Sequence, residues 1–575
     1  MRFQPIIESF TTGEISPLLL GRVSTDQYSA GCKTMENAIP ESHGGFKRRP
    51  GSVFVSEVKD STKSTRLIPF NISRDESYIL ELGDLYMRFY TNHGQIQSGG
   101  SAYEITTPWG QNDLFDIHFA QANDIMYMVH DKFNPRKLTH SGSTSWALSQ
   151  PTLTGTPWNG NADNHADGFP RTVAFFEQRL WLGGTISKPN TLWGSKVGDF
   201  ENFTIPGTAN PDDPVEYTLA TYTKDTLQWL APAEVLFIGT TANEHRLAPN
   251  SYISVDNLPD ITRQSSYGSR HIQPQYIGSK TVFVQGSGLQ VRTFSINTRA
   301  SVEVYDSINL AWLNEHITVG GIVDMSFEMI PDSILWSVRN DGTLLSMTYD
   351  PALGDTGFEG VGWARHPMDG NVESVATIYS SAKDETWVVV KRTINSVTKR
   401  YIEYLDSAKY TDSTLSYSGS SATTIGGLTH LEGKVLNILA DGAVHPQKTV
   451  ASGSITLDYA ATAVDAGLPF TPKVIPVEVE GGIPSGVSQG LPKRWVQCKL
   501  RLHQSALPKV NGVRPADRTP ASPMDAVEPL TTGDSQHYNL GHSENGQITI
   551  EQDLPVAMHV LAVFGHMTVS AGGQA

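Results

Sequence analysis

The chain has 575 residues, with 43 Lys and Arg against 59 Asp and Glu, which gives a formal net charge of −16. That length exceeds what one hydrophobic core usually serves, so we expect two or three domains. So acidic a chain is a poor general nucleic-acid binder, because such binding depends on Lys and Arg contacts with phosphates. No run of 18 apolar residues occurs, so we expect no transmembrane helix.

The N-terminal sequence MRFQPIIESFTTGE has no basic region followed by an apolar run, so we expect no secretory signal peptide. Cys32 and Cys498 are the only cysteines. Two cysteines make neither a disulfide framework nor a cysteine-based zinc site, and they suit assembly in a reducing cytoplasm. Helical patterns are sparse, and the best candidate for a helix is the segment 16–39.

From residue 77 onward, short apolar runs come in pairs that are joined by turn residues. β-Branched and aromatic residues flank Gly, Asn and Asp, which tolerate positive φ, and this pattern predicts β-hairpins. The paired runs are 77–90, 124–139, 173–195, 233–247, 281–294, 333–349 and 385–405. We expect the turns at Gly83-Asp84, Asn134-Pro135, Gly183-Gly184 with Lys188-Pro189-Asn190, Thr241-Ala242-Asn243, Gly286-Ser287-Gly288, Asn340-Asp341-Gly342 and Asn395-Ser396.

The hairpins recur at a loose but steady spacing. Markers within successive hairpins are 46 to 60 residues apart; they are Tyr78, Ile125, Phe175, Val235, Thr281, Ile334 and Trp387. A strand-rich repeat close to this length is typical of the blades of a β-propeller. The sequence therefore predicts a propeller-like ring of six or seven blades over residues 71–410, with a series of ordinary antiparallel sheets as the alternative.

Residues 411–575 differ in character, being rich in Gly, Ser, Thr and Pro. Strands are expected at 430–442, 454–461, 494–503 and 548–555, and a long loop at 510–534. The predicted fold class is therefore all-β with little helix. The predicted division is an N-terminal arm over residues 1–70, the propeller-like ring over 71–410 and a C-terminal β-rich domain over 411–575.

Catalytic signatures are lacking: there is no HExxH, GxSxG or complete phosphate-binding loop. The acids Asp212, Asp213, Asp341, Asp384, Glu385 and Glu403 are formal candidates for a hydrolytic pair. Most of these acids are expected in turns, where Asp is common for structural reasons. We assign no catalytic residue, metal ligand or cofactor.

Tryptophans fall in or beside the predicted strands. They are 109, 158, 181, 193, 312, 336, 363 and 387. Core packing accounts for such a set, and a sugar-stacking platform is the alternative.

The stretch HGGFKRRPGS, residues 43–52, concentrates cations in an acidic chain. Lys47, Arg48 and Arg49 lead directly into Pro50 and Gly51. Three interpretations are open: a solvated turn, a contact with another subunit or an adaptor, and a contact with DNA. Because the planar guanidinium pairs carboxylates in a bidentate manner, we take Lys47, Arg48, Arg49, Pro50 and Gly51 as the candidate interface.

The first 55 residues carry a family resemblance. The order of their Gly, Pro, aromatic and charged residues is similar to that of tail nozzle proteins of short-tailed bacteriophages, also called tail tubular protein B. Segments 169–203, with Arg179-Leu180 and a Trp-x-Ser at 193–195, and 427–457 resemble the same family. The residues concerned are Phe10, Gly13, Glu14, Ser16, Pro17, Gly21, Arg22, Asp26, Tyr28, Gly31, Asn37, Gly44, Gly45, Arg48, Arg49, Pro50, Gly51 and Phe54.

The resemblance implies a structural virion protein that forms a homohexameric tube at the distal end of the tail. The tube would be attached to head–tail adaptor proteins below the portal, near tail fibre or spike proteins, and genomic DNA would pass through it at ejection. Assembly would take place in the host cytoplasm. Because DNA must slide, we expect a lumen that is not lined by Lys and Arg.

Our leading hypothesis is thus a non-enzymatic tail nozzle. Alternatives are a tail-associated receptor-binding or glycan-degrading protein and a cellular propeller used as a scaffold. From the candidate interface we expect that replacing Arg48 and Arg49 together by Ala leaves the chain folded but impairs tail assembly.

Overall fold

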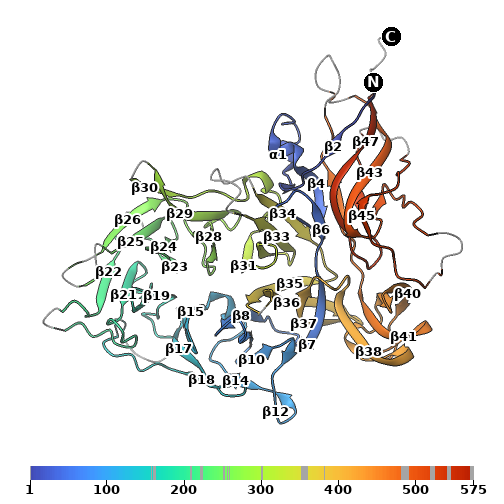
Figure 1. Cartoon of the computed structure of the whole chain (residues 1–575). Coiled ribbons are helices and arrows are strands. Elements are labelled where there is room, and N and C mark those ends of the chain that lie inside the picture. The colour runs from blue at the N-terminus through green and yellow to red at the C-terminus, as the bar shows by residue number, and fades with distance from the viewer. Residues whose placement is uncertain are drawn as a thin grey trace.

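The computed structural model shows a molecule built almost wholly of β-strands, in two parts that lie side by side (Figure 1). It describes residues 2–569 except 157, 159–162, 207–209, 221–223, 250–252, 255, 256, 258, 300, 301, 351–359, 381, 481–487, 489, 490, 519–522, 524 and 541–545. The larger part is a ring of small antiparallel sheets, and the smaller part contains the C-terminal strands.

In the described residues the ring has seven blades, the first of five strands and the others of four, which confirms the propeller-like fold. The first blade contains β8 (Arg66–Asn71), β9 (Ser77–Gly83), β10 (Tyr86–Thr91) and β11 (Gly94–Gln95), with β14 (Glu104–Thr106) also paired to β10. The second contains β15 (His118–Ala122), β16 (Ile125–His130), β17 (Phe133–His140) and β18 (Trp146–Ser149). The third contains β19 (Thr172–Phe176), β20 (Arg179–Gly183), β21 (Thr191–Gly194) and β22 (Val215–Thr218).

The remaining blades follow the same order. The fourth contains β23 (Leu227–Pro232), β24 (Leu236–Thr240), β25 (Glu244–Ala248) and β26 (Asp260–Ser265). The fifth contains β27 (Gln275–Ile277), β28 (Lys280–Val284), β29 (Val291–Arg299) and β30 (Val302–Asp306). The sixth contains β31 (Ile322–Glu328), β32 (Ile334–Arg339), β33 (Leu344–Tyr349) and β34 (Val361–His366).

The seventh blade closes the ring with a strand from the other end of the chain. It contains β35 (Asn371–Ile378), β36 (Glu385–Ile394) and β37 (Val397–Asp406), and its fourth strand is β7 (Gly51–Glu57). The first strand of each blade is the innermost. At the closure, Ser374 on β35 donates to the Asp324 carboxylate on β31 (2.6 Å) and accepts the Leu67 amide of β8 (3.1 Å). These bonds join the sixth, seventh and first blades.

The N-terminal strands connect the ring to the C-terminal part. The sheet of the sixth blade continues through β3 (Gly13–Glu14) and β4 (Gly31–Glu36) into β42 (Lys473–Pro476), β46 (Ile550–Glu551) and β44 (Lys509–Val510). The sheet of the seventh blade continues through β7 into β38 (Asp412–Ile425), β41 (Ile455–Leu468), β39 (Val435–Ala440) and β40 (Ala443–Thr449). Two blades and the C-terminal part therefore share continuous sheets.

A third sheet combines strands from both ends of the chain. It contains β45 (Thr531–Asp534), β43 (Lys493–Ser505), β47 (His559–Val569), β6 (Phe46–Arg48) and β5 (Ala38–Pro40), with β1 (Arg2–Phe3) and β2 (Ile6–Ile7) also paired to β47. The short remaining elements are β12 (Gln97–Ser98), β13 (Ser101–Ala102), α1 (Asp26–Ser29) and the 3₁₀ turns η1 (Pro17–Leu19), η2 (Leu114–Asp116), η3 (Trp312–Asn314) and η4 (Thr429–Leu431).

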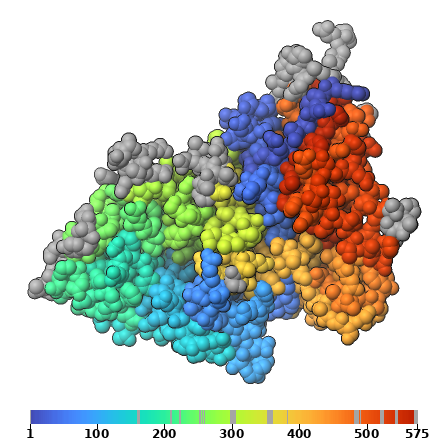
Figure 2. All heavy atoms as spheres, viewed as in Figure 1, coloured from blue at the N-terminus to red at the C-terminus, as the bar shows by residue number. Residues whose placement is uncertain are grey.

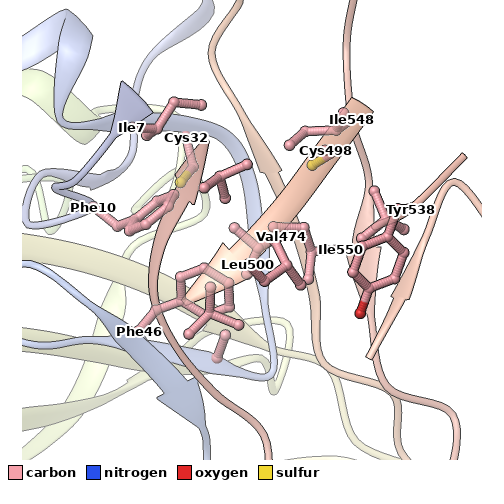
Figure 3. Packing of buried hydrophobic residues seen from close by; sticks show 14 of the residues in the cluster. Ile7, Phe10, Cys32, Phe46, Val474, Cys498, Leu500, Tyr538, Ile548 and Ile550 are labelled. Carbon is pink, nitrogen blue, oxygen red and sulfur yellow. The ribbon is translucent and has the colours of Figure 1, made fainter. Parts of the chain in front are cut away.

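The core under this third sheet is assembled from both ends of the chain (Figure 3). Phe10, Cys32 and Phe46 pack with Cys498 and Leu500. Both cysteines are buried free thiols. Burial raises the pKa of the Cys498 thiol to about 12, and burial likewise raises the pKa of Cys32 well above its ordinary value, so both stay protonated at neutral pH.

Most of the expected hairpin turns occur where the sequence places them. The turn at Asn395-Ser396, for example, lies between β36 and β37 and has φ of 47° and 63°. Two details differ. Asn134 and Pro135 lie within β17, and the turn falls at 131–132; a further turn at Glu177-Gln178 splits the run 173–183 into β19 and β20.

The expected helix over 16–39 is wrong. Only four residues, Asp26–Ser29, are α-helical, and β4 and β5 follow. The pattern of apolar residues in this segment reflects strand burial, since Cys32, Met35 and Ala38 are fully buried. Tertiary pairing with β42 and β34 thus overrides helix propensity.

The strand pairing also corrects the expected N-terminal arm. Residues 1–70 contribute strands to three sheets and to the first blade, so they form no separate unit. In the space-filling view the N-terminal segment lies between the ring and the C-terminal part (Figure 2). None of the helices in the described residues is long and apolar enough to span a membrane.

Candidate functional sites at the domain joint and the mouth of the ring

The cation cluster lies where the ring meets the C-terminal part, a region that we call the domain joint (residues 37–51 with Tyr410, Asp412, Phe470, Leu554 and Val556). Lys47 and Arg48 are in β6, and Gly51 begins β7. Arg48 and Arg49 are only 5% and 1% exposed. Their burial rules out the solvated turn and also the contacts with another subunit or DNA through these two side chains.

Arg48 binds backbone oxygens. Its guanidinium donates to Leu554 (2.7 Å), Val556 (3.2 Å), Tyr410 (2.8 Å) and Phe470 (2.9 Å). Burial, reinforced by the neighbouring charge of Arg49, lowers the pKa of Arg48 to about 9. One side chain therefore ties three separate segments of the chain, at 410, 470 and 554–556, to β6.

Arg49 forms the bidentate pair that the sequence suggested, but within its own chain. Its two terminal nitrogens donate to the two Asp412 carboxylate oxygens at 2.8 and 2.6 Å, and Nε donates to Asn37 Oδ1 at 2.8 Å. The guanidinium groups of Arg48 and Arg49 lie 4.2 and 3.7 Å from the centre of the Phe470 ring. Cation–π attraction therefore adds to the ion pair.

The rest of the cluster serves the same joint. Half-buried Lys47 donates to Asp332 (2.7 Å), in the turn between β31 and β32, and lies 3.3 Å from Glu41. The Pro50 carbonyl accepts from Arg49 at 2.8 Å. At Gly51 a Cβ atom would lie 2.3 Å from the Thr411 carbonyl oxygen, so the start of β7 has no room for a side chain.

Other residues that carry the family resemblance lie at the edge of the joint. Gly13 has φ of 66°, and a Cβ there would lie 2.2 Å from the Trp363 carbonyl oxygen. The buried Glu14 carboxylate accepts from the Met35 amide, His316 and Arg365, all at 2.8 Å. These residues hold the N-terminal segment against the sixth blade.

Arg179, from the second segment that carries the resemblance, has a comparable role inside the third blade. It is 1% exposed and donates to the carbonyls of Ser195 (2.6 Å), Asp213 (2.8 Å) and Ile253 (2.9 Å). Sequence reasoning recognised these positions but could not show that they act by holding backbone segments together.

The candidate acids are engaged in structural contacts. Glu403 pairs with Arg392 at 3.0 and 2.9 Å, and both side chains are fully buried. Asp384 accepts the backbone amides of Met329 and Ile330. The remaining partners are Arg339 for Asp341, Lys196 for Asp212, the Asn210 amide for Asp213 and His93 for Glu385.

Tryptophans support the packing interpretation. Of the eight singled out, all except Trp312 are less than 5% exposed, and Trp312 is 45% exposed. The described residues contain no cluster of three His, Cys, Asp or Glu side chains that could hold a metal ion.

A cavity of about 500 Å³ lies at one end of the ring axis. Ser64, Asp116, His271, Val323 and Asn371 line it, and they lie at or just before the innermost strands of five blades. The turn between β32 and β33, Arg339–Gly342, completes the wall. We call this cavity the channel mouth. No sequence motif predicted it.

Two stacked histidines lie at the channel mouth, and one of them, His271, lines the cavity. The rings of His118 and His271 are parallel within 3°, with centres 3.9 Å apart. His271 Nδ1 lies 2.7 Å from the Gln228 carbonyl oxygen, and its Nε2 lies 3.1 Å from that of Asp116. Burial lowers the pKa of His271 to about 3 and that of His118 well below its ordinary value.

Comparisons with known proteins place the chain in no family. No family model matches it, and no curated protein matches it. Among solved structures it is similar to the β-propeller domain of Cps50 (Swd1) from Myceliophteria thermophila, with 8% identity, a TM-score of 0.37, and coverage of 62% of this chain and 100% of that chain. It is also similar to the Pan2 WD40 domain of Neurospora crassa, with 8% identity, a TM-score of 0.32, and coverage of 62% and 95%. The propeller assignment follows from the strand pairing itself.

Proposed function

We propose that this chain is a non-enzymatic structural subunit of a short-tailed phage tail nozzle, a hexameric conduit for DNA ejection below the portal and adaptor rings. The sequence resemblance is the origin of the proposal. The observation that favours it is the domain joint, which contains Asn37, Arg48, Arg49, Pro50 and Gly51 from the N-terminal segment that carries the resemblance. They serve the rigid connection of two β-structures rather than a catalytic centre.

A subunit of a load-bearing tube needs its parts fixed relative to one another. Here the sheets of two blades run without a break into the C-terminal part. The hydrogen bonds of buried Arg48 to backbone carbonyls and the buried Arg49–Asp412 ion pair reinforce this connection. Continuous hydrogen-bonded sheets resist hinge motion better than a flexible linker does.

The net charge of −16 fits a conduit for DNA, since an acidic wall does not retain phosphate. We propose that lumen-facing surfaces carry few unpaired Lys and Arg side chains. A ring whose lumen is lined with such cations would contradict this part of the proposal.

A receptor-binding protein of the tail is the second candidate, and the channel mouth favours it because a cavity of about 500 Å³ can receive a small ligand. Glycan degradation has less support, since the acids considered above have structural partners. An assay for glycan cleavage by the purified chain tests that activity directly.

The deciding experiment is the copy number of the chain in purified particles, by quantitative peptide mass spectrometry against the portal subunit. The nozzle proposal expects about one copy per two portal subunits, six against twelve. Adaptor and tailspike peptides from the same digest provide internal standards. A ratio equal to that of the tailspike chains would favour the receptor-binding candidate, and absence of the chain from particles would refute both.

A further inference from the structure

We propose that the channel mouth binds an anionic oxyacid group, a carboxylate or a phosphate, which accepts hydrogen bonds from Arg270 and is attracted by the positive charge of His271 in its imidazolium form. This site is independent of the assembly role proposed above. It rests on unpaired cations in the cavity wall and on the hydrogen-bond geometry of His271.

Arg270 is the first of these cations. It lines the channel mouth, and its side chain makes no hydrogen bond or ion pair within the described part of the chain. A Cβ on Gly288 would lie 2.2 Å from one guanidinium nitrogen, so the guanidinium rests against that backbone. An arginine held in this way presents N–H donors in a fixed orientation, which suits a carboxylate or phosphate.

Lys391 is the second. It also lines the cavity, and no hydrogen bond or ion pair of its ammonium group occurs among the described residues. Two acids of the wall are already neutralised: Asp341 pairs with Arg339, and Glu373 pairs with Arg400. Among the remaining charged groups of the wall, one acid, Asp116, stands against two cations, Arg270 and Lys391. The wall therefore carries a net positive charge although the protein as a whole is strongly acidic.

His271 adds a third positive group when it is protonated. Both of its ring nitrogens face carbonyl oxygens, which only accept hydrogen bonds. A neutral imidazole carries one N–H and can satisfy only one of these carbonyls. The imidazolium carries two and satisfies both.

Without an anion nearby, the surroundings of His271 disfavour its protonated form. Burial depresses the pKa of His271, and Arg171 depresses it further, whereas the two carbonyl contacts and Asp131 act in the opposite direction. Stacked His118 is subject to the charges of Arg66 and Arg171 and stays neutral. Its Nε2 and the Arg171 Nε are buried without a hydrogen-bond partner in the described residues. An anion in the channel mouth offsets the positive charge of Arg270 and of protonated His271, both of which line the cavity.

The test is isothermal titration calorimetry of the full chain with two probes, sulfate and N-acetyl-glutamate amide. Neither probe changes its own protonation between pH 6 and pH 8. Titration at pH 6.0 in two buffers of different ionisation enthalpy yields the number of protons taken up on binding. We expect saturable binding of at least one probe, uptake approaching one proton, and an affinity that falls by up to tenfold per pH unit as pH rises. Competition between the probes shows whether the site prefers a free oxyanion or a protein carboxylate.

Arg270→Ala is expected to weaken binding about tenfold or more, because it removes the charge-assisted hydrogen bonds. Lys391→Ala is expected to weaken it less. Arg263→Ala is the matched control, since Arg263 is exposed on the outer strand β26, away from the cavity. Unchanged thermal midpoints show that each variant is folded.

Absence of binding by the wild type at millimolar probe would overturn the proposal. Equal binding by Arg270→Ala and Arg263→Ala would overturn it too, because the anion would then sit elsewhere. Binding without proton uptake would remove His271 from the site.

Discussion

The free energy of unfolding of this molecule depends strongly on the single residues that form its buried arginine–carboxylate pairs. Arg49 with Asp412 and Arg392 with Glu403 are both almost fully buried, and Ser52 of β7 donates to Glu403 at 2.5 Å. Removing one member of such a pair leaves an unpaired charge out of reach of water. That loss is more costly than the net stabilisation that the intact pair provides.

Replacement of Arg49 by Met should lower the free energy of unfolding by about 3–5 kcal/mol, because Asp412 is left buried and unpaired. Urea unfolding followed by fluorescence measures this. The result would replace the sequence-based expectation that the Arg48 and Arg49 double alanine variant stays folded and fails only in assembly.

Arg501→Met is the control, since the Arg501–Asp534 pair is exposed to solvent, which screens it, and its loss should barely change the free energy of unfolding. Arg49→Met combined with Asp412→Leu should recover part of the loss, because no charge then remains unpaired. An Arg49 variant as stable as the Arg501 variant would show that the joint does not depend on this pair.

Glu328 should give the unfolding free energy a specific pH dependence. Burial raises the pKa of this carboxyl to about 7 from a reference value of 4.5, although Trp336 and Thr386 donate to it. Between these values the folded state holds a proton that the unfolded state has released, so stability decreases as pH rises.

We therefore expect the unfolding free energy of Glu328→Gln, relative to wild type, to increase by up to about 3 kcal/mol between pH 4 and pH 8. Denaturant unfolding at several pH values measures this difference. Glu234→Gln, at an exposed position, should show no such trend. A flat difference for Glu328→Gln would mean that the buried carboxyl titrates normally.

At the scale of elements, β7 is the critical strand because it closes the ring and begins the connection to β38. Gly51→Val should displace the start of β7, since any side chain there meets the Thr411 carbonyl. We expect a lower thermal midpoint and faster hydrogen exchange in β37, which loses its neighbour. Gly21→Val is the control, because no atom lies within 4 Å of a Cβ at that position. Unchanged exchange in β37 would show that ring closure tolerates the displacement.

Local signals explain which elements were predicted and which were not. Asn395-Ser396 is a turn because its own residues favour positive φ. Asn134 and Pro135 carry similar turn chemistry, yet they continue a strand. They lie at the register shift between β16 and β17, and proline is tolerated at such an irregularity. The segment 16–39 has no strand alternation of its own. Its strands pair with β3 and β6 nearby and with β34 and β42, which lie hundreds of residues away along the chain.

At the scale of the whole molecule, the C-terminal part depends on the N-terminal strands. β47 pairs with β1, β2 and β6, and β42 pairs with β4. A fragment containing residues 411–575 would therefore expose long unpaired strand edges and an incomplete core.

We expect this fragment to be unfolded or aggregated when expressed alone. Co-expression with residues 1–410 should yield a soluble complex, because the break falls between β37 and β38. Circular dichroism and co-purification measure the two outcomes, with the intact chain as reference. A monomeric, folded fragment 411–575 would show that its own strands suffice.

The sequence alone determined the all-β class, the repeat of about 50 residues and most hairpin turns, because hydrophobic pattern and turn chemistry are local properties. It also singled out Arg48 and Arg49, because the cation cluster that contains them lies within ten consecutive residues, 43–52. The tertiary structure decided their environment, since Asp412 lies 363 residues from Arg49 along the chain. It likewise decided the strand that closes the ring and the residues that meet at the channel mouth. These features arise only when distant segments pack together, and no local pattern encodes which segments will meet.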